Sequence, residues 1–165
     1  MGYLLGYVGT IWAANWLIAT FGLVPVGFGL LAPAGVYAAG LALTLRDGVQ
    51  ERLGQRWTLG AIVAGAALSA LVSPQFAVAS GVAFGVSELV DMAVYTPLRE
   101  RDRWLLAVAA SNTVGLVMDS VLFLALAFGS LDFLIGQVVA KVYVTAATVA
   151  LLWAWRRAVI VPQGA

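Results

Sequence analysis

Long apolar runs, broken by glycine, proline or charged residues, make up most of this chain. They cover residues 3–21, 33–53, 57–73, 76–97, 104–128 and 132–155. Because a helix rises about 1.5 Å per residue and the hydrocarbon core of a bilayer is about 30 Å thick, one crossing needs roughly 20 apolar residues. The pattern therefore predicts an all-α integral membrane protein, a bundle of six transmembrane helices that forms one domain over residues 1–165.

Several residues at the ends of these runs are typical of helix starts and stops. Pro33 suits the first turn of the second helix, Gly54 its C-cap, and Pro97 the end of the fourth helix. The break at 22–32 is itself apolar, so it either forms a short hairpin or dips into the membrane against other parts of the protein. No basic segment precedes the first run, which favours a retained first helix over a cleaved signal peptide.

The basic residues that flank the runs all fall at one end of a six-helix arrangement. They are Arg46, Arg52, Arg56, Arg99, Arg101, Arg103, Arg156 and Arg157. Because cytoplasmic loops carry the excess of Lys and Arg in membrane proteins, we expect both termini in the cytoplasm. Tryptophans gather at the same boundary, as an interfacial aromatic belt does: Trp57, Trp104, Trp153 and Trp155.

The composition narrows the chemistry that this chain can perform. Of its 165 residues, 62% are hydrophobic and 10% are charged, whereas soluble domains contain about 25% charged residues. Cysteine and histidine are absent, which removes disulfides, thiol nucleophiles, Ser–His pairs and the usual zinc ligands. We therefore expect no enzyme activity, no metal and no cofactor. The net charge of +1 gives no reason to expect nucleic-acid binding.

Polar side chains inside the apolar runs are the candidates for function. A charge at the bilayer centre is costly, so such residues normally face a cavity or a partner. Here they form three stripes with helical spacing: Ser87, Glu88 and Asp91 in the fourth run, Asn112 and Asp119 in the fifth, and Gln137 and Lys141 in the sixth. Because residues three, four or seven apart share a helix face, the stripes predict one polar interior.

Counting residues from the arginines predicts how these side chains pair. Asp119 and Lys141 both fall in the outer half of the membrane, so we expect a buried ion pair that either fixes helix register or takes part in binding. Glu88 falls roughly 16 Å deep, near the midplane, where no cation lies at its own depth. We therefore expect Glu88 to be the main ligand-recognition residue.

Two further groups of residues each have two interpretations. Trp12, Asn15 and Trp16 lie together in the first run, and the two rings either stack on a flat ligand that the amide orients, or face lipid. Asp47 and Glu51 lie among arginines near the end of the second run. These two acids form either a solvated, salt-bridged helix end or a secondary site at the cytoplasmic end.

Three stretches give the chain a family resemblance. They are ASGVAFGVSELVDMAVYTPLRER, SNTVGLVMDSVLFLALAFG and GQVVAKVYVT. Together with the upstream ANWL and AGVYAAGLALTLRDGVQERLG, they resemble the vitamin uptake transporter family, also called the queuosine precursor transporters, from about Ala14 to Thr145. The resemblance implies a small six-span protein of the inner cell membrane. It also implies import of a 7-deazaguanine base, such as 7-cyano-7-deazaguanine, into the cytoplasm.

The resemblance further implies which side chains meet the base. It carries over Asn15, Asp47, Glu51, Ser87, Glu88, Asp91, Ser111, Asn112, Asp119, Ser120, Gln137 and Lys141. A guanine-type edge presents N1–H and an exocyclic amine as adjacent donors, which one carboxylate can accept, while amides complement O6. We expect a site near the midplane between the first, fourth, fifth and sixth helices. Its expected members are Asn15, Glu88, Asn112 and Gln137, with Trp12 or Trp16 as a wall.

Other functions remain as alternatives. The chain could be the substrate-binding component of an energy-coupling-factor importer, which also has about six helices and works only with a transmembrane scaffold and ATPases. The ordered acid and amide stripes argue against a pore or a structural protein, and the absent His and Cys argue against a membrane enzyme. The sequence leaves open which base is carried, whether uptake is coupled to protons, and whether the protein forms a homo-oligomer.

Overall fold

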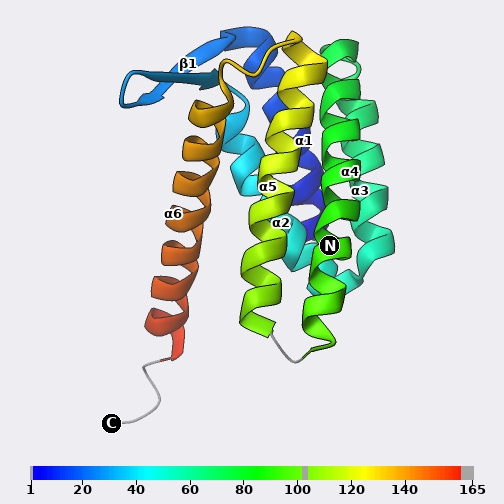
Figure 1. Ribbon diagram of the computed structural model, residues 1–165, viewed down its shortest axis with the longest axis vertical. Coiled ribbons are helices and arrows are strands. Elements are labelled where there is room, and N and C mark those ends of the chain that lie inside the picture. The colour runs from blue at the N-terminus through cyan, green and yellow to red at the C-terminus, as the bar shows by residue number, and fades with distance from the viewer. Residues whose placement is uncertain (1, 102–103, 161–165) are drawn as a thin grey trace.

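The computed structural model describes residues 2–101 and 104–160, in which six helices form an all-α bundle (Figure 1). The helices are α1 (Gly2–Phe21), α2 (Val36–Leu53), α3 (Gln55–Ser69), α4 (Pro74–Arg99), α5 (Trp104–Phe128) and α6 (Leu134–Ile160). They follow the six apolar runs, so the predicted fold class is confirmed. Within the described residues, three segments are long and apolar enough to cross a membrane: Gly2–Phe21, Pro74–Tyr95 and Ala110–Phe128.

The connection between α1 and α2 is an antiparallel hairpin of β1 (Leu23–Gly27) and β2 (Leu30–Pro33). Its two-residue loop has positive φ at both positions, 52° at Phe28 and 74° at Gly29, which matches the twist of the flanking strands. Pairing with Leu23 keeps Pro33 extended, and α2 begins only at Val36. The hairpin interpretation of this break is therefore confirmed, and the placement of Pro33 in a helix is wrong.

The two other boundary predictions have different outcomes. Gly54 ends α2 as predicted, with a φ of 85° and its N–H bonded to the carbonyl oxygen of Gln50. Pro97 does not end α4, which continues to Arg99. A proline so close to the end of a helix removes one hydrogen bond near the terminus, and the last turn can still form.

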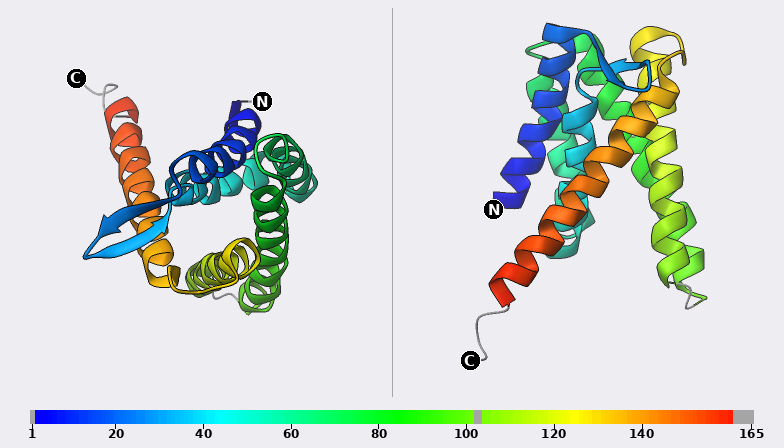
Figure 2. Two further views of the ribbon diagram at one scale, coloured as in Figure 1. Left: turned by 90° about the horizontal axis from the view of Figure 1, so that it is seen from above. Right: turned by 90° about the vertical axis from the view of Figure 1, so that its left-hand side faces the viewer.

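The helices form two groups that meet along a seam. α5 packs mainly against α4, whereas α6 packs mainly against α2 and the hairpin, and α1 joins α2 and α3. Figure 2 shows α5 and α6 close together near the hairpin and diverging away from it. Apolar residues of α1, α2 and α3, with Phe84 of α4, form the larger core cluster. We use "seam" below for the boundary between the α4–α5 pair and the other helices.

The two ends of the bundle differ in charge. The β1–β2 hairpin, the α3–α4 connection and the α5–α6 connection lie at one end, called here the hairpin end (Figures 1 and 2). The α2–α3 connection, the start of α1 and the end of α6 lie toward the other end, called here the arginine end. Exposed Arg52, Arg56 and Arg101 belong to it. This arrangement agrees with the expected orientation, in which the arginine end is cytoplasmic; the orientation itself stays a prediction.

Candidate functional site

A buried ion pair joins α5 and α6 across the seam. Lys141 is fully buried, and its Nζ donates to Oδ2 of Asp119 and, over 2.9 Å, to Oγ of Ser120. The hydroxyl of Ser120 donates in turn to the carbonyl of Leu116 over 2.8 Å. The predicted pairing of Asp119 with Lys141 is therefore confirmed. Each charge neutralises the other in the interior of the bundle, where either one alone would be costly.

A second polar cluster ties three helices together through the amide of Asn15. Its Nδ2 donates to the carbonyl of Ile11 over 3.0 Å and to Oγ of Ser69 over 3.1 Å. Its Oδ1 accepts a hydrogen bond from Ser80 over 2.9 Å. Since both ends of the amide are bonded within the protein, Asn15 holds α1, α3 and α4 in place and has little capacity left for a ligand.

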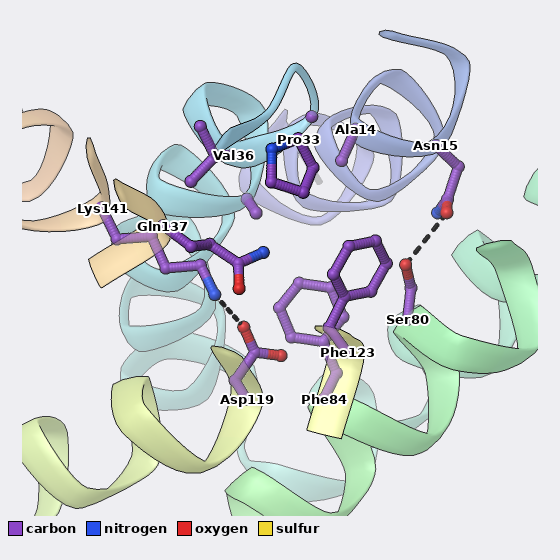
Figure 3. A pocket seen from close by; sticks show the side chains of 12 residues that line it. Ala14, Asn15, Pro33, Val36, Ser80, Phe84, Asp119, Phe123, Gln137 and Lys141 are labelled. Atoms are coloured by element: carbon purple, nitrogen blue, oxygen red, sulfur yellow. Dashed lines mark hydrogen bonds and ion pairs between the residues drawn. The ribbon is translucent and has the colours of Figure 1, made fainter. Parts of the chain in front are cut away.

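A pocket lies between these two clusters (Figure 3). The space between the lining atoms, together with the open mouth, is about 350 Å³. The residues that line it are Ala14, Asn15, Pro33, Gly35, Val36, Ala39, Ser80, Phe84, Asp119, Phe123, Gln137 and Lys141. The pocket thus involves the four helices that the sequence predicted, and also β2 and the start of α2.

Two phenylalanines supply apolar walls of the pocket. Phe84 lies one turn beyond Ser80 on α4, and Phe123 lies one turn beyond Asp119 on α5. Each ring therefore shares a helix face with a polar side chain of the pocket. Figure 3 shows the two rings beside Asp119. The pocket combines flat apolar surface with a carboxylate, an arrangement that suits a flat ring with polar edges.

The tryptophans of α1 do not take part in this pocket. Trp12 and Trp16 are each 40% exposed, and their rings stack on each other with centroids 6.2 Å apart. Ala14 and Asn15 turn inward from the same helix and are buried. Trp12 and Trp16 turn away from the buried face of α1 and form no wall of this pocket, so a role for them in binding stays a prediction.

Gln137 differs from Asn15 because its side-chain amide oxygen has no partner among the described residues. Its Oε1 is buried and has no hydrogen-bond partner among the described residues. The residue lies in the first turn of α6, where the hairpin comes so close that a Cβ on Gly136 would be 2.1 Å from the carbonyl oxygen of Leu31. A buried acceptor without a partner costs about 1–3 kcal/mol. An amide held in this way, in the wall of a pocket, indicates where a donor on a ligand can bind.

A second buried ion pair lies nearer the arginine end and joins α2 to α4. Nη1 of Arg46 is 3.0 Å from Oε2 of Glu88, and the two side chains are 8% and 1% exposed. Nη2 of Arg46 is 3.5 Å from Oδ1 of Asn112 on α5. The expectation that Glu88 has no cation at its own depth is therefore wrong. Arg46, which the sequence placed at the cytoplasmic boundary, extends its long side chain into the bundle instead of out of it.

The single site predicted from the sequence is divided between two depths. Asn15 and Gln137 line the pocket, whereas Glu88 and Asn112 belong to the Arg46 cluster and do not line it. The pocket carboxylate is Asp119. The three polar stripes do meet in one interior, but they form two clusters within it.

Other candidate residues have separate outcomes. The hydroxyl of Ser87 donates to the carbonyl of Phe84 over 3.0 Å, a bond within its own helix. Asp91 is 9% exposed and does not line the pocket. The side chains of Asp47 and Glu51 lie outside the part of the chain that is described, so their role at the cytoplasmic end stays a prediction.

Comparison with known proteins identifies the family. Residues 70–155, just over half of the chain, match a family described as "Putative vitamin uptake transporter". The chain belongs to the vitamin uptake transporter family. The matched range includes Glu88, Asp91 and both partners of the Asp119–Lys141 ion pair. No curated protein and no solved structure matches the chain.

Family membership makes this protein a membrane transporter that takes up a small molecule. Sequence reasoning missed several residues of the transporter's pocket, although the signal for three of them was present. Ser80 and Phe84 lie two turns and one turn before Glu88 on the same face of α4, and Phe123 continues the face of Asp119 on α5. Extending the polar stripes toward the hairpin end would have found all three.

Proposed function

We propose that this transporter imports a queuosine precursor or a related 7-deazaguanine base, such as 7-cyano-7-deazaguanine, into the cytoplasm. Family membership supports uptake of a small molecule, and the resemblance of α4, α5 and α6 to queuosine precursor transporters supports the base. One observation carries the proposal. The pocket presents a buried amide oxygen without a partner among the described residues, Oε1 of Gln137, together with the carboxylate of Asp119.

Asp119 and Gln137 are the proposed base-recognition residues. Lys141 holds one carboxylate oxygen of Asp119, and Figure 3 shows the other oxygen turned toward Phe84 and Phe123. That oxygen and Oε1 of Gln137 can accept the N1–H and the exocyclic amine of a guanine-type edge. The two phenylalanine rings offer apolar surface to the faces of the base.

The proposal includes where the protein works. The single domain would lie in the inner cell membrane with its arginine end in the cytoplasm, as the positive-inside rule predicts. A reporter fused after Ala165 should then be active on the cytoplasmic side. A reporter there that is active only outside the cytoplasm would show that the orientation is reversed.

Uptake by the purified protein in liposomes, with no other protein added, tests the substrate. We expect saturable uptake of radiolabelled 7-cyano-7-deazaguanine, with competition by bases that have the guanine-type donor edge. Adenine should compete poorly because it lacks those adjacent donors. Liposomes that contain Gln137→Leu are the matched control, since this variant keeps the side-chain size but loses the amide. The proposal fails if the parent neither binds nor takes up any 7-deazaguanine.

The same liposomes distinguish the solitary carrier from the other candidate. A substrate-binding component of an energy-coupling-factor importer would bind the base alone but would need its scaffold and ATPases to move it. Binding without uptake would therefore favour that alternative. Uptake without partners supports the solitary carrier.

A further inference from the structure

The ion pair between Arg46 and Glu88 joins α2 to α4 on the arginine-end side of the pocket. Arg46 lies about 15 Å further along α2 than the pocket residue Val36, and Glu88 lies about one turn beyond the pocket residue Phe84. From this position Arg46 bonds to α4 through Glu88 and reaches α5 through Asn112. One side chain thus crosses the seam beneath the pocket, between the pocket and the arginine end.

Asp91 lies one turn beyond Glu88 on the same face of α4, nearer the arginine end. It is 9% exposed, and its Oδ1 is buried without a hydrogen-bond partner within the described part of the chain. The carboxyl rests against α5 at Gly115, where an added Cβ would come 3.4 Å from Oδ1. A buried carboxyl in this condition lowers stability in the present arrangement. Its burial without a partner among these residues suggests a search for a second arrangement in which Asp91 is paired.

We propose that Arg46 is the gate on the cytoplasmic side of the pocket, and that it exchanges Glu88 for Asp91 when this gate opens. The proposal rests on the proposed function in taking the pocket as the transport site. Successive turns of a helix are about 5.4 Å apart, a step that the flexible arginine side chain can make with its five N–H donors. A buried cation that leaves its carboxylate is costly unless another acid takes its place. Asp91 receives it, so Asp91 is a positioning residue for transport.

Labelling of a thiol in the pocket can measure whether this gate is open or closed, and the measurement needs no substrate. The parent chain contains no cysteine, so Ala39→Cys places a single thiol in the pocket wall. A membrane-impermeant maleimide applied to inverted and to right-side-out vesicles then measures access to the pocket from each side. The labelling of Ala39→Cys alone is compared with the labelling of Ala39→Cys combined with a substitution at Glu88 or at Asp91.

Two nearly isosteric substitutions should change cytoplasmic access in opposite directions. Glu88→Gln weakens the closed arrangement, so labelling from the cytoplasmic side should rise by about tenfold. Asp91→Asn removes the open-state partner and leaves the Arg46–Glu88 pair intact, so labelling from that side should fall below the Ala39→Cys level. The matched control is Asp132→Asn, a like change at an exposed aspartate in the α5–α6 connection, which should have no effect.

A purely structural role predicts a different result. If Glu88 and Asp91 only support the fold, both substitutions loosen the bundle and labelling rises in both, which would overturn the proposal. Unchanged labelling in Asp91→Asn would also overturn it. Because Asp91→Asn keeps the ion pair, it tests the gate even where Glu88→Gln does not fold. Asp91→Glu restores the charge and should recover cytoplasmic labelling.

The labelling result is independent of the base assigned above. If 7-deazaguanines are neither bound nor carried, the opposite responses of the two variants still support the gate. If they are carried, Asp91→Asn should slow uptake by at least about tenfold while the dissociation constant for the base changes by less than about twofold. A matching loss of affinity in Asp91→Asn would place Asp91 in the binding site and overturn its role in gating.

Discussion

The pocket cluster and the Arg46 cluster contain similar chemistry at two depths. Each has a buried cation, a carboxylate from the α4–α5 pair and a side-chain amide. The described residues form a pocket around the first cluster, whereas Glu88 and Asn112 of the second do not line it. The difference shows that a buried ion pair does not by itself mark a binding site. The amide oxygen of Gln137, which has no partner among the described residues and lies in the pocket wall, is the more specific sign.

The largest expected effect comes from breaking the ion pair at the pocket. Lys141→Met leaves the Asp119 carboxylate buried without its cation, so the free energy of unfolding should fall by about 3–5 kcal/mol. Thermal unfolding in detergent, with and without base, measures this loss. Adding Asp119→Asn to Lys141→Met should recover part of the stability, because no buried charge is then stranded. If Lys141→Met were as stable as the parent, the ion pair would contribute little to the stability of this cluster.

The hairpin offers the second test, because it reaches the pocket cluster and not the Arg46 cluster. In Gly136→Ala the new methyl group meets the carbonyl oxygen of Leu31, so the hairpin or α6 must shift. We expect a loss of about 1–3 kcal/mol, as for other overpacked positions. Gly85→Ala is the control, because a Cβ there has nothing within 4 Å. Equal unfolding temperatures for the two variants would contradict the close approach of the hairpin to α6.

The affinity for the base should depend on Gln137, whose amide oxygen has no partner among the described residues, and not on Gln75, whose amide is already bonded. Gln137→Leu removes a hydrogen bond to the base, worth about 1–1.5 kcal/mol, so the dissociation constant should rise about tenfold while stability is unchanged or improved. Gln75→Leu is the matched control. Nε2 of Gln75 already donates to the carbonyl of Ala127 over 2.8 Å, outside the pocket. Isothermal titration measures both affinities, and equal values would remove Gln137 from the site.

The smallest effect is expected at the tryptophans on the outer face of α1. Trp12→Leu should leave the dissociation constant for the base within about twofold of the parent value, because the ring does not line the pocket. The same titration measures it. A fivefold or larger loss of affinity would show that Trp12 belongs to the binding site.

Helix positions and one ion pair could be predicted from the sequence because they depend on local patterns. Apolar run length sets the helices, and helical spacing with a count of depth was enough to pair Asp119 with Lys141. Arg46 could not be placed in the same way. A long side chain at a helix end can extend toward water or toward the interior, and only the position of Glu88 on a neighbouring helix decides between them.

The pocket walls were harder to predict for a related reason. Pro33, Gly35 and Val36 reach the pocket only because the chain before them folds as a hairpin, a contact between segments that periodicity does not report. On α1, the spacing did not show which side faces inward, because Asn15 lies three residues after Trp12 and next to Trp16. Trp12 and Trp16 point outward in a bilayer at no great cost, so hydrophobicity alone does not decide which face is buried.

The division of charge between the two helix groups bears on the surroundings in which the protein can work. Arg46 and Lys141 come from α2 and α6, whereas Glu88 and Asp119 come from α4 and α5. Dissolved ions weaken attraction between exposed charges beyond about 8 Å at physiological salt, but they act much less on buried pairs. The attraction across the seam is therefore nearly independent of ionic strength. The two helix groups should therefore keep these contacts in dilute buffer and in concentrated salt alike.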